Sequence, residues 1–263
     1  MRQFVIAMIA VCMLCFPTTI QADVESPLHT WKELNQTSDR ILQLVKVEEY
    51  AEAKQLLDYF AKIFLEIDFQ SERITMNALR TVTISFEKAE EAVTATELPL
   101  EKRIYHVTSF RLAVDALSSE YNPLWLHSKE AVMYALESME GAIKKKDLQA
   151  FQHRFNEFLL QYNMIRPALL IDLKPEQLQR IASQITFMEK HRNQIDVEIL
   201  LPHMDIMNEE WIKLYDQIKE DSTDPSLWWI MITMGGMITL SLTYAGWKKY
   251  QADKKKVRIK EDE

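Results

Sequence analysis

The segment Leu227–Trp247 carries no charged residue over about 21 positions. Because an α-helix rises 1.5 Å per residue, a segment of this length can cross the roughly 30 Å hydrocarbon core of a bilayer. Aromatic residues, which favour membrane interfaces, stand near both ends: Trp228 and Trp229 at one, Tyr244 and Trp247 at the other. We therefore predict a transmembrane helix over residues 226–247, in preference to a buried helix of a soluble protein.

The charges that flank this segment predict its orientation. Lys248 and Lys249 begin a tail, residues 248–263, with 7 basic and 4 acidic residues, and acidic residues dominate the opposite flank. Basic residues are retained on the cytoplasmic side of a membrane. The tail is therefore predicted to be cytoplasmic, next to anionic lipid headgroups, and the rest of the chain to lie outside the cytoplasm.

The first 22 residues have the features of a secretory signal peptide. Arg2 precedes an apolar run, Phe4–Phe16, which is too short to span a bilayer, and Ala22 offers a small residue for cleavage. An uncleaved anchor is the alternative interpretation. Cys12 and Cys15 are the only cysteines, so a cleaved chain has none, which excludes cysteine catalysis and cysteine-ligated metal.

The middle of the chain has the pattern of an all-α protein. Between residues 23 and 224 there is one glycine, Gly141, and no Asn-Gly or Asp-Gly turn, whereas strand-rich domains need many tight turns. Apolar residues recur every three or four positions, which predicts a bundle of about eight amphipathic helices. Helix boundaries are predicted at the prolines, and helix starts at two aspartates: Pro27, Pro99, Pro123, Pro167, Pro175 and Pro202, with Asp147 and Asp172.

Two stretches about 98 residues apart look alike. Aligning Tyr50 with Leu148 superposes the apolar positions that follow, up to Phe64 on Tyr162. This pattern suggests two tandem four-helix units, residues 23–122 and 123–225, divided near Pro123. Chance agreement between amphipathic helices is the alternative.

The composition of the middle segment argues against several classes of function. It has 23 basic and 35 acidic residues, a net charge of about −12, which disfavours binding to nucleic acid. Neither the nucleophile motif G-x-S-x-G nor a glycine-rich phosphate loop occurs. The zinc motif H-E-x-x-H is absent, and no histidine has a glutamate three positions before it, as di-iron bundles require. His127 and Glu130 could share a helix face, but a metal site needs more ligands. We therefore expect no catalytic residue, no cofactor and no bound metal.

Small residues in the apolar segment suggest a contact within the membrane. Gly235 and Gly236, with Thr239 and Thr243, would form a small-residue face if the segment is helical. Such faces allow two transmembrane helices to approach closely. The hypothesis is a homodimer that forms through this helix.

The whole chain resembles the YpjB family of sporulation proteins from endospore-forming relatives of Bacillus. The similarity is carried by the order of the parts and by three stretches of text: KVEEYAEAKQLLDYFAKIF (46 to 64), SSEYNPLWLHSKEAVMYAL (118 to 136) and YAGWKKY (244 to 250). These are packing motifs, and the family supplies no catalytic residue to transfer. The resemblance implies a role in endospore formation at the membrane of a Gram-positive cell.

These observations lead to three hypotheses about function. The first is a non-enzymatic scaffold or interaction protein, anchored in the cell membrane, whose helical domain meets a protein partner on the extracytoplasmic side. The second is a small receptor-like regulator that senses an extracytoplasmic ligand and couples to a separate cytoplasmic partner. The third is a metal-dependent enzyme, which requires that histidines and carboxylates converge in the folded chain.

Overall fold

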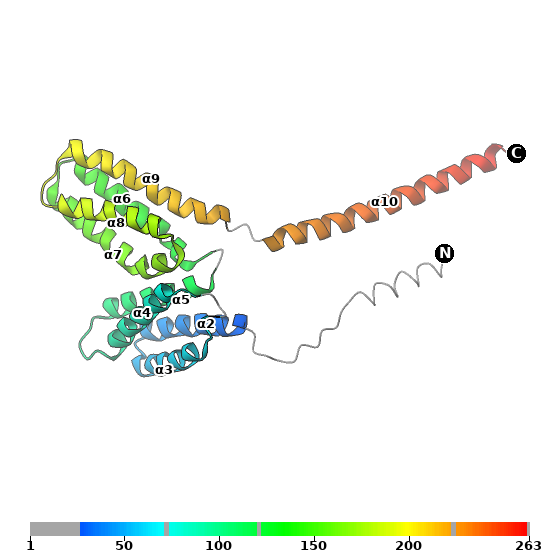
Figure 1. Cartoon of the computed structure of the whole chain (residues 1–263). Helices are drawn as coiled ribbons and strands as arrows, with labels where there is room; N and C mark the ends of the chain where they lie inside the picture. Colours follow the sequence, from blue (N-terminus) through cyan, green and yellow to red (C-terminus); the bar gives the residue numbers. More distant parts are fainter. Residues whose placement is uncertain (1–26, 71–73, 120–121, 222–224, 262–263) are drawn as a thin grey trace.

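The computed structural model describes residues 27–70, 74–119, 122–221 and 225–261, and the signal peptide expected over residues 1–22 lies outside them. Every regular element in this part of the chain is a helix (Figure 1). The elements are α2 (Pro27–Lys46), α3 (Tyr50–Glu66), α4 (Met76–Thr94), α5 (Leu100–Ser118), η1 (Leu124–Ser128), α6 (Lys129–Lys144), α7 (Leu148–Asp172), α8 (Pro175–Lys190), α9 (Val197–Asp221) and α10 (Pro225–Glu261).

The all-α prediction is confirmed: the described residues form eight α-helices, α2 to α9, ahead of one long carboxy-terminal helix. Local side chains explain several of the helix starts. The Thr75 hydroxyl accepts a hydrogen bond from the amide of Ala78 at 3.1 Å, and the Asp147 carboxylate accepts one from Ala150 at 3.0 Å. Each cap satisfies an amide that has no partner within its helix. Pro175 occupies the first turn of α8, where a missing N–H costs nothing.

The helices α2 to α5 form the first unit, a closed ring. In it, α2 packs against α3 and α5, and α4 packs against the same two helices. Apolar side chains from all four helices meet in one buried cluster. At its centre the Phe60 ring contacts the edge of Phe110, with 4.9 Å between ring centroids.

The helices α6 to α9 form the second unit, in which α6 packs against α7 and α9, and α8 packs against α9. An aromatic ladder on α7 fills its core: Phe151, Phe155, Phe158 and Tyr162 stack with successive centroid separations of 6.1, 6.5 and 6.3 Å. Trp211 of α9 lies edge-on to this ladder, 5.8 Å from Phe158. Phe151, Phe155, Phe158 and Trp211 are among the largest fully buried side chains of the described residues.

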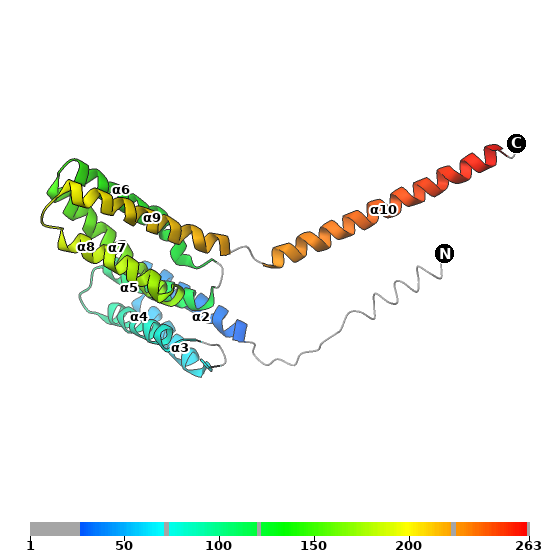
Figure 2. The ribbon, with the colours of Figure 1, turned by 45° about the horizontal axis from the view of Figure 1, so that its top comes forward.

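Three elements join the two units. The helix α7 packs against α4 and α5 of the first unit, and Figures 1 and 2 both show α5 and α7 side by side. Leu112 and Ala116 of α5 belong to the core of the second unit, and Trp125 of η1 is fully buried there. Because buried side chains cross between the units, the division near Pro123 stays a prediction.

Three of the expected helix boundaries are wrong. Pro167 lies inside α7, Pro202 lies inside α9, and Asp172 is the last residue of α7 instead of the start of a helix. Beside Pro167, Ile165, Ala168 and Leu169 are fully buried. A proline removes one helical hydrogen bond, and the packing of neighbouring apolar residues offsets that loss here.

Candidate functional site

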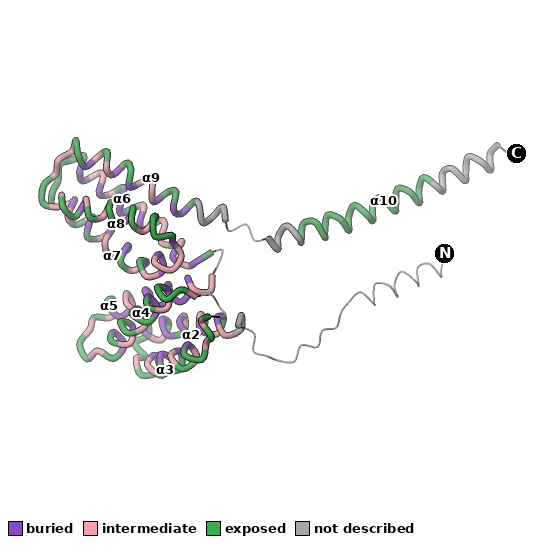
Figure 3. Tube along the Cα trace, in the orientation of Figure 1, coloured by how far each residue is buried: buried purple, intermediate pink, exposed green. Residues whose placement is uncertain are grey.

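The helix α10 extends away from the two units (Figure 1). Its apolar stretch, Ile230–Tyr250, is 21 residues long, and each of its residues is exposed (Figure 3). The helix is thus long and apolar enough to cross a membrane. The apolar stretch overlaps the predicted span of 226–247, and its location in a membrane stays a prediction.

The expected interface residues all lie on α10. Trp228 and Trp229 stand near its start, although their side chains are outside the described part of the chain. Tyr244 and Trp247 are exposed near the other end of the apolar stretch. The helix does not end at Lys248 and Lys249 but continues to Glu261, so most of the basic tail is helical.

Polar groups within the apolar stretch are satisfied by the helix itself. The Thr239 hydroxyl donates to the carbonyl of Gly235 at 2.8 Å, and the Thr243 hydroxyl donates to the carbonyl of Thr239 at 2.7 Å. Such bonds remove the cost of placing a hydroxyl in hydrocarbon. A Cβ atom added at Gly235 or Gly236 would meet open space, so neither glycine is required by packing within the chain.

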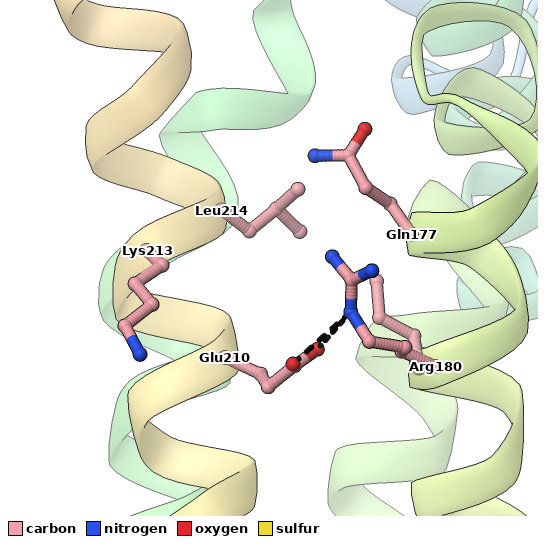
Figure 4. A pocket seen from close by; sticks show the side chains of 6 residues that line it. Gln177, Arg180, Glu210, Lys213 and Leu214 are labelled. Carbon is pink, nitrogen blue, oxygen red and sulfur yellow. Dashed lines mark hydrogen bonds and ion pairs between the residues drawn. The ribbon is translucent and has the colours of Figure 1, made fainter.

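The described residues contain no cluster of three or more His, Cys, Asp or Glu side chains that could hold a metal ion. A hollow of about 50 Å³ lies between α8 and α9 (Figure 4). Arg180 and Glu210 point towards each other across it and form an ion pair at 3.1 Å. Because the hollow is small and its central charges neutralise each other, it is a poor site for a ligand.

A larger groove of about 450 Å³ lies between α3 and α4. Its walls are almost entirely apolar, and glutamates stand at its edge. The apolar lining is formed by Phe60, Ala61, Phe64, Leu65, Phe69, Leu79, Val82 and Phe86, and the remaining residues are Thr83, Glu87 and Glu90. We call this the aromatic groove.

The aromatic groove is built on stacked rings. Phe60 stacks on Phe64 at 5.6 Å and on Phe86 at 5.9 Å, and Phe69 closes one end, 5.0 Å from Phe64. Because each ring is held by another, the groove keeps its shape without an occupant. Leu65, at its rim, exposes 79% of its surface. An open apolar hollow of this kind is typical of protein interaction sites.

A buried polar cluster lies at the junction of the units. The Trp125 indole donates to the Asp172 carboxylate at 2.5 Å, and Asp115 accepts a hydrogen bond from the amide of Leu124 at 2.6 Å. Burial raises the pKa of Asp172 to about 7, and the nearby Asp115 adds to this effect. Nearby, the Tyr215 hydroxyl and Ser128 are 2.9 Å apart, and burial raises the pKa of Tyr215 to about 12. The cluster fixes η1 against α5, α7 and α9.

Arg103 is a buried cation with a structural explanation. Its guanidinium donates to four carbonyl groups at the end of α4 and the loop that follows: Ala92, Val93, Ala95 and Leu98, at 2.5 to 3.1 Å. It also lies 4.4 Å from the ring of Tyr50. Cations are favourable at the carboxy-terminal end of a helix, so Arg103 serves to hold the α4–α5 connection.

Comparison with known proteins identifies the family. The model of the family described as Sporulation protein YpjB (SpoYpjB) matches residues 31–259, which is most of the chain. The chain belongs to the YpjB family of sporulation proteins. A similar relative is the uncharacterized protein YpjB of Bacillus subtilis (strain 168), which is 29% identical over 230 residues, 86% of this chain and 87% of that protein. No solved structure matches.

Membership of the YpjB family supports a role in sporulation. It does not point to a site, and no motif in the sequence indicates the aromatic groove. Phe60 and Phe64 look like core residues in the sequence because they keep helical spacing. Leu65 and Phe69 fall outside that pattern. In the structure Leu65 is exposed and Phe69 is half-buried. A groove between two helices depends on how those helices pack.

Proposed function

We propose that this YpjB-family chain is a membrane-anchored interaction protein that acts outside the cytoplasm in endospore formation. The aromatic groove carries the proposal, because an open apolar hollow with stacked walls suits the side chain of a partner protein. The apolar stretch of α10 supplies the anchor. The motif-poor sequence favours binding over catalysis.

Charges at the groove indicate the kind of partner. Glu87 is exposed at its edge, and Glu90 is half-buried and pairs with Lys54 at 3.2 Å. An acidic edge around an apolar floor favours a segment that presents an aromatic or aliphatic side chain next to basic residues. We propose a protein partner of this chemistry on the extracytoplasmic side.

The test is site-specific photo-crosslinking of the full-length chain in sporulating cells. A benzophenone amino acid at Leu65, on the rim of the groove, should give one discrete adduct. Val47 exposes 66% of its surface, lies in the turn between α2 and α3, and provides the control position. Equal adducts from both positions, or none from Leu65, would contradict the proposal.

A substitution connects the adduct to function. Leu65→Lys should repel a basic partner, remove the adduct formed from a second benzophenone at Thr83, and lower the yield of spores. Val47→Lys changes the charge equally away from the groove and should leave both unchanged. Normal sporulation with Leu65→Lys, at normal protein level, would show that the groove is not used.

Orientation is tested with single cysteines in a chain freed of its own two. A cysteine at Val47 should react with a membrane-impermeant maleimide in intact protoplasts. A cysteine at Lys256 should react only after the membrane is opened. The reverse pattern would place the aromatic groove in the cytoplasm.

The homodimer stays a proposal: Gly235→Leu with Gly236→Leu should lower association in a membrane two-hybrid assay.

The receptor-like alternative has one observation in its favour. The helix α10 runs without a break from Pro225 through the apolar stretch to Glu261, so it could connect an external event to the tail. Deletion after Tyr250, with Lys248 and Lys249 retained to preserve orientation, separates the two functions. An external interaction protein should still support sporulation, whereas a receptor should not.

A further inference from the structure

A second large groove lies between the units, where α4, α5 and α7 meet. Its volume is about 490 Å³, within the range of small-molecule sites. The lining residues of each helix recur every three or four positions, so they lie on one face of that helix. The lining residues are Thr81, Ile84, Ser85 and Lys88 from α4, Tyr105, His106 and Ser109 from α5, and Asn163, Arg166, Pro167 and Leu170 from α7. We call this the junction groove.

Small hydroxyl residues form the floor of the junction groove. Thr81, Ser85 and Ser109 are buried, with relative exposures of 7, 5 and 9%. Larger side chains at these positions would fill the space between the helices, so their small size explains the hollow. The hydroxyls of Thr81 and Ser85 donate to carbonyls within α4, which leaves the floor uncharged.

Two cationic side chains and a histidine stand around the rim. Lys88 and Arg166 are exposed, His106 is half-buried, and each comes from a different helix. None of the lining residues is acidic, although the chain carries a formal charge of −8. Burial and the neighbouring charge of Lys88 lower the pKa of His106, as does Lys102, while Glu91 acts in the opposite direction. The groove is therefore a local region of positive potential in an acidic protein.

The junction groove differs in chemistry from the two hollows described above. The aromatic groove is apolar, and the hollow between α8 and α9 holds an ion pair that neutralises itself. The junction groove has two cations at its rim, Lys88 and Arg166. Beside them lie the apolar side chains of Ile84 and Leu170 and the ring of Tyr105. This combination matches a molecule with a charged end and a compact body.

We propose that the junction groove binds a small organic anion, a phosphate or carboxylate on a ring-sized body. Lys88, His106 and Arg166 would hold the anionic end from three sides. Arg166 can offer two parallel N–H groups to such an oxyanion. Ile84, Tyr105 and Leu170 would enclose the body. The site is separate from the aromatic groove, so it does not depend on the protein interaction proposed above.

The experiment is a thermal-unfolding titration of the full-length chain in neutral detergent. The probes are inorganic phosphate, phenyl phosphate, benzoate and uncharged benzyl alcohol, at matched ionic strength. A ligand that binds the folded state raises Tm in a concentration-dependent way. Phenyl phosphate should raise Tm by a few degrees, benzoate and phosphate by less, and benzyl alcohol not at all. The order of the first three shows whether the site prefers phosphate or carboxylate.

A matched pair of variants locates the site. Lys88→Gln with Arg166→Gln should weaken the apparent Kd for phenyl phosphate at least about tenfold, because two charge-assisted contacts are lost. Lys62→Gln with Arg80→Gln removes the same charge from exposed positions outside the groove and should leave the Kd unchanged. No Tm shift with any of the three anions, or equal weakening by both variants, would overturn the proposal.

Discussion

The two four-helix units contain the same kind of turn, and in each unit a residue other than glycine adopts the left-handed conformation in it. Glu48, between α2 and α3, and Lys146, between α6 and α7, are the two described non-glycine residues with positive φ, at 64° and 57°. In both turns the next amide bonds back five residues, Glu49 to Leu44 at 2.9 Å and Asp147 to Ala142 at 3.0 Å. The same left-handed cap thus ends α2 and α6.

The helices that follow these turns bury equivalent side chains. Both start at the second residue after the cap, α3 at Tyr50 and α7 at Leu148. Four positions about 98 residues apart are buried in each: Ala53 and Phe151, Leu57 and Phe155, Phe60 and Phe158, Phe64 and Tyr162. The two helices therefore bury side chains at corresponding positions, and a duplication of the two halves stays a prediction.

The units differ where these helices end. The helix α3 stops at Glu66, after 17 residues, whereas α7 runs for 25 residues to Asp172. The additional turns of α7 reach α4 and α5, carry the Asp172 partner of Trp125, and form one wall of the junction groove. The greater length of α7 therefore accounts for both the interface between the units and one wall of the junction groove.

The largest expected effect tests whether the two cores unfold together. Phe60 and Phe158 occupy equivalent, fully buried positions. Phe60→Ala and Phe158→Ala should each lower the free energy of unfolding by about 3–5 kcal/mol. Because α5 and α7 join the cores, we expect one cooperative transition for both variants in urea, followed by circular dichroism. Two separate transitions would show that the units are independent.

A smaller effect compares a buried arginine of the first unit with a more exposed arginine of the second. Arg103→Met leaves four carbonyl groups without their donor and should cost about 2–4 kcal/mol. Arg192, near the α8–α9 connection, pairs with Glu189 at 2.7 Å in a more exposed position, so Arg192→Met should cost less than about 1 kcal/mol. Equal losses of stability in denaturant titrations would contradict this difference.

The extension of α7 should make stability depend on pH. The native-state pKa of Asp172, about 7, lies above its ordinary value, so the folded chain holds this proton more tightly than the unfolded chain. Stability from this group therefore falls as pH rises from about 4 to about 7 and levels off above that. The difference in Tm between pH 5 and pH 8 should be several degrees smaller for Asp172→Asn than for the unchanged chain. An unchanged difference would show that other groups cause it.

The smallest effect tests the shared turn. Glu48→Gly and Lys146→Gly should each stabilise the chain by about 0.5–1 kcal/mol, because relief of the left-handed strain outweighs the added chain entropy. Glu49→Gly, one residue away at φ −82°, should be destabilising. Chemical denaturation measures all three. A gain at one turn only would show that the two turns are not equivalent.

The sequence by itself determined the helical class, the family, and the eight α-helices that the described residues form between Pro27 and Asp221. Helical spacing of apolar residues and scarce glycine act locally, so they can be read without knowledge of packing. The helix boundaries predicted at Pro167 and Pro202 are wrong, because buried neighbouring side chains keep each helix intact across its proline.

Only the tertiary structure decided where helices from distant parts of the chain meet. Lys88, His106 and Arg166 are far apart in sequence, and each looks like an ordinary surface residue until α4, α5 and α7 pack together. The aromatic groove likewise exists because α3 and α4 leave rings of their core open at one edge. Sites formed between helices depend on packing angles and side-chain volumes, which helical periodicity does not encode.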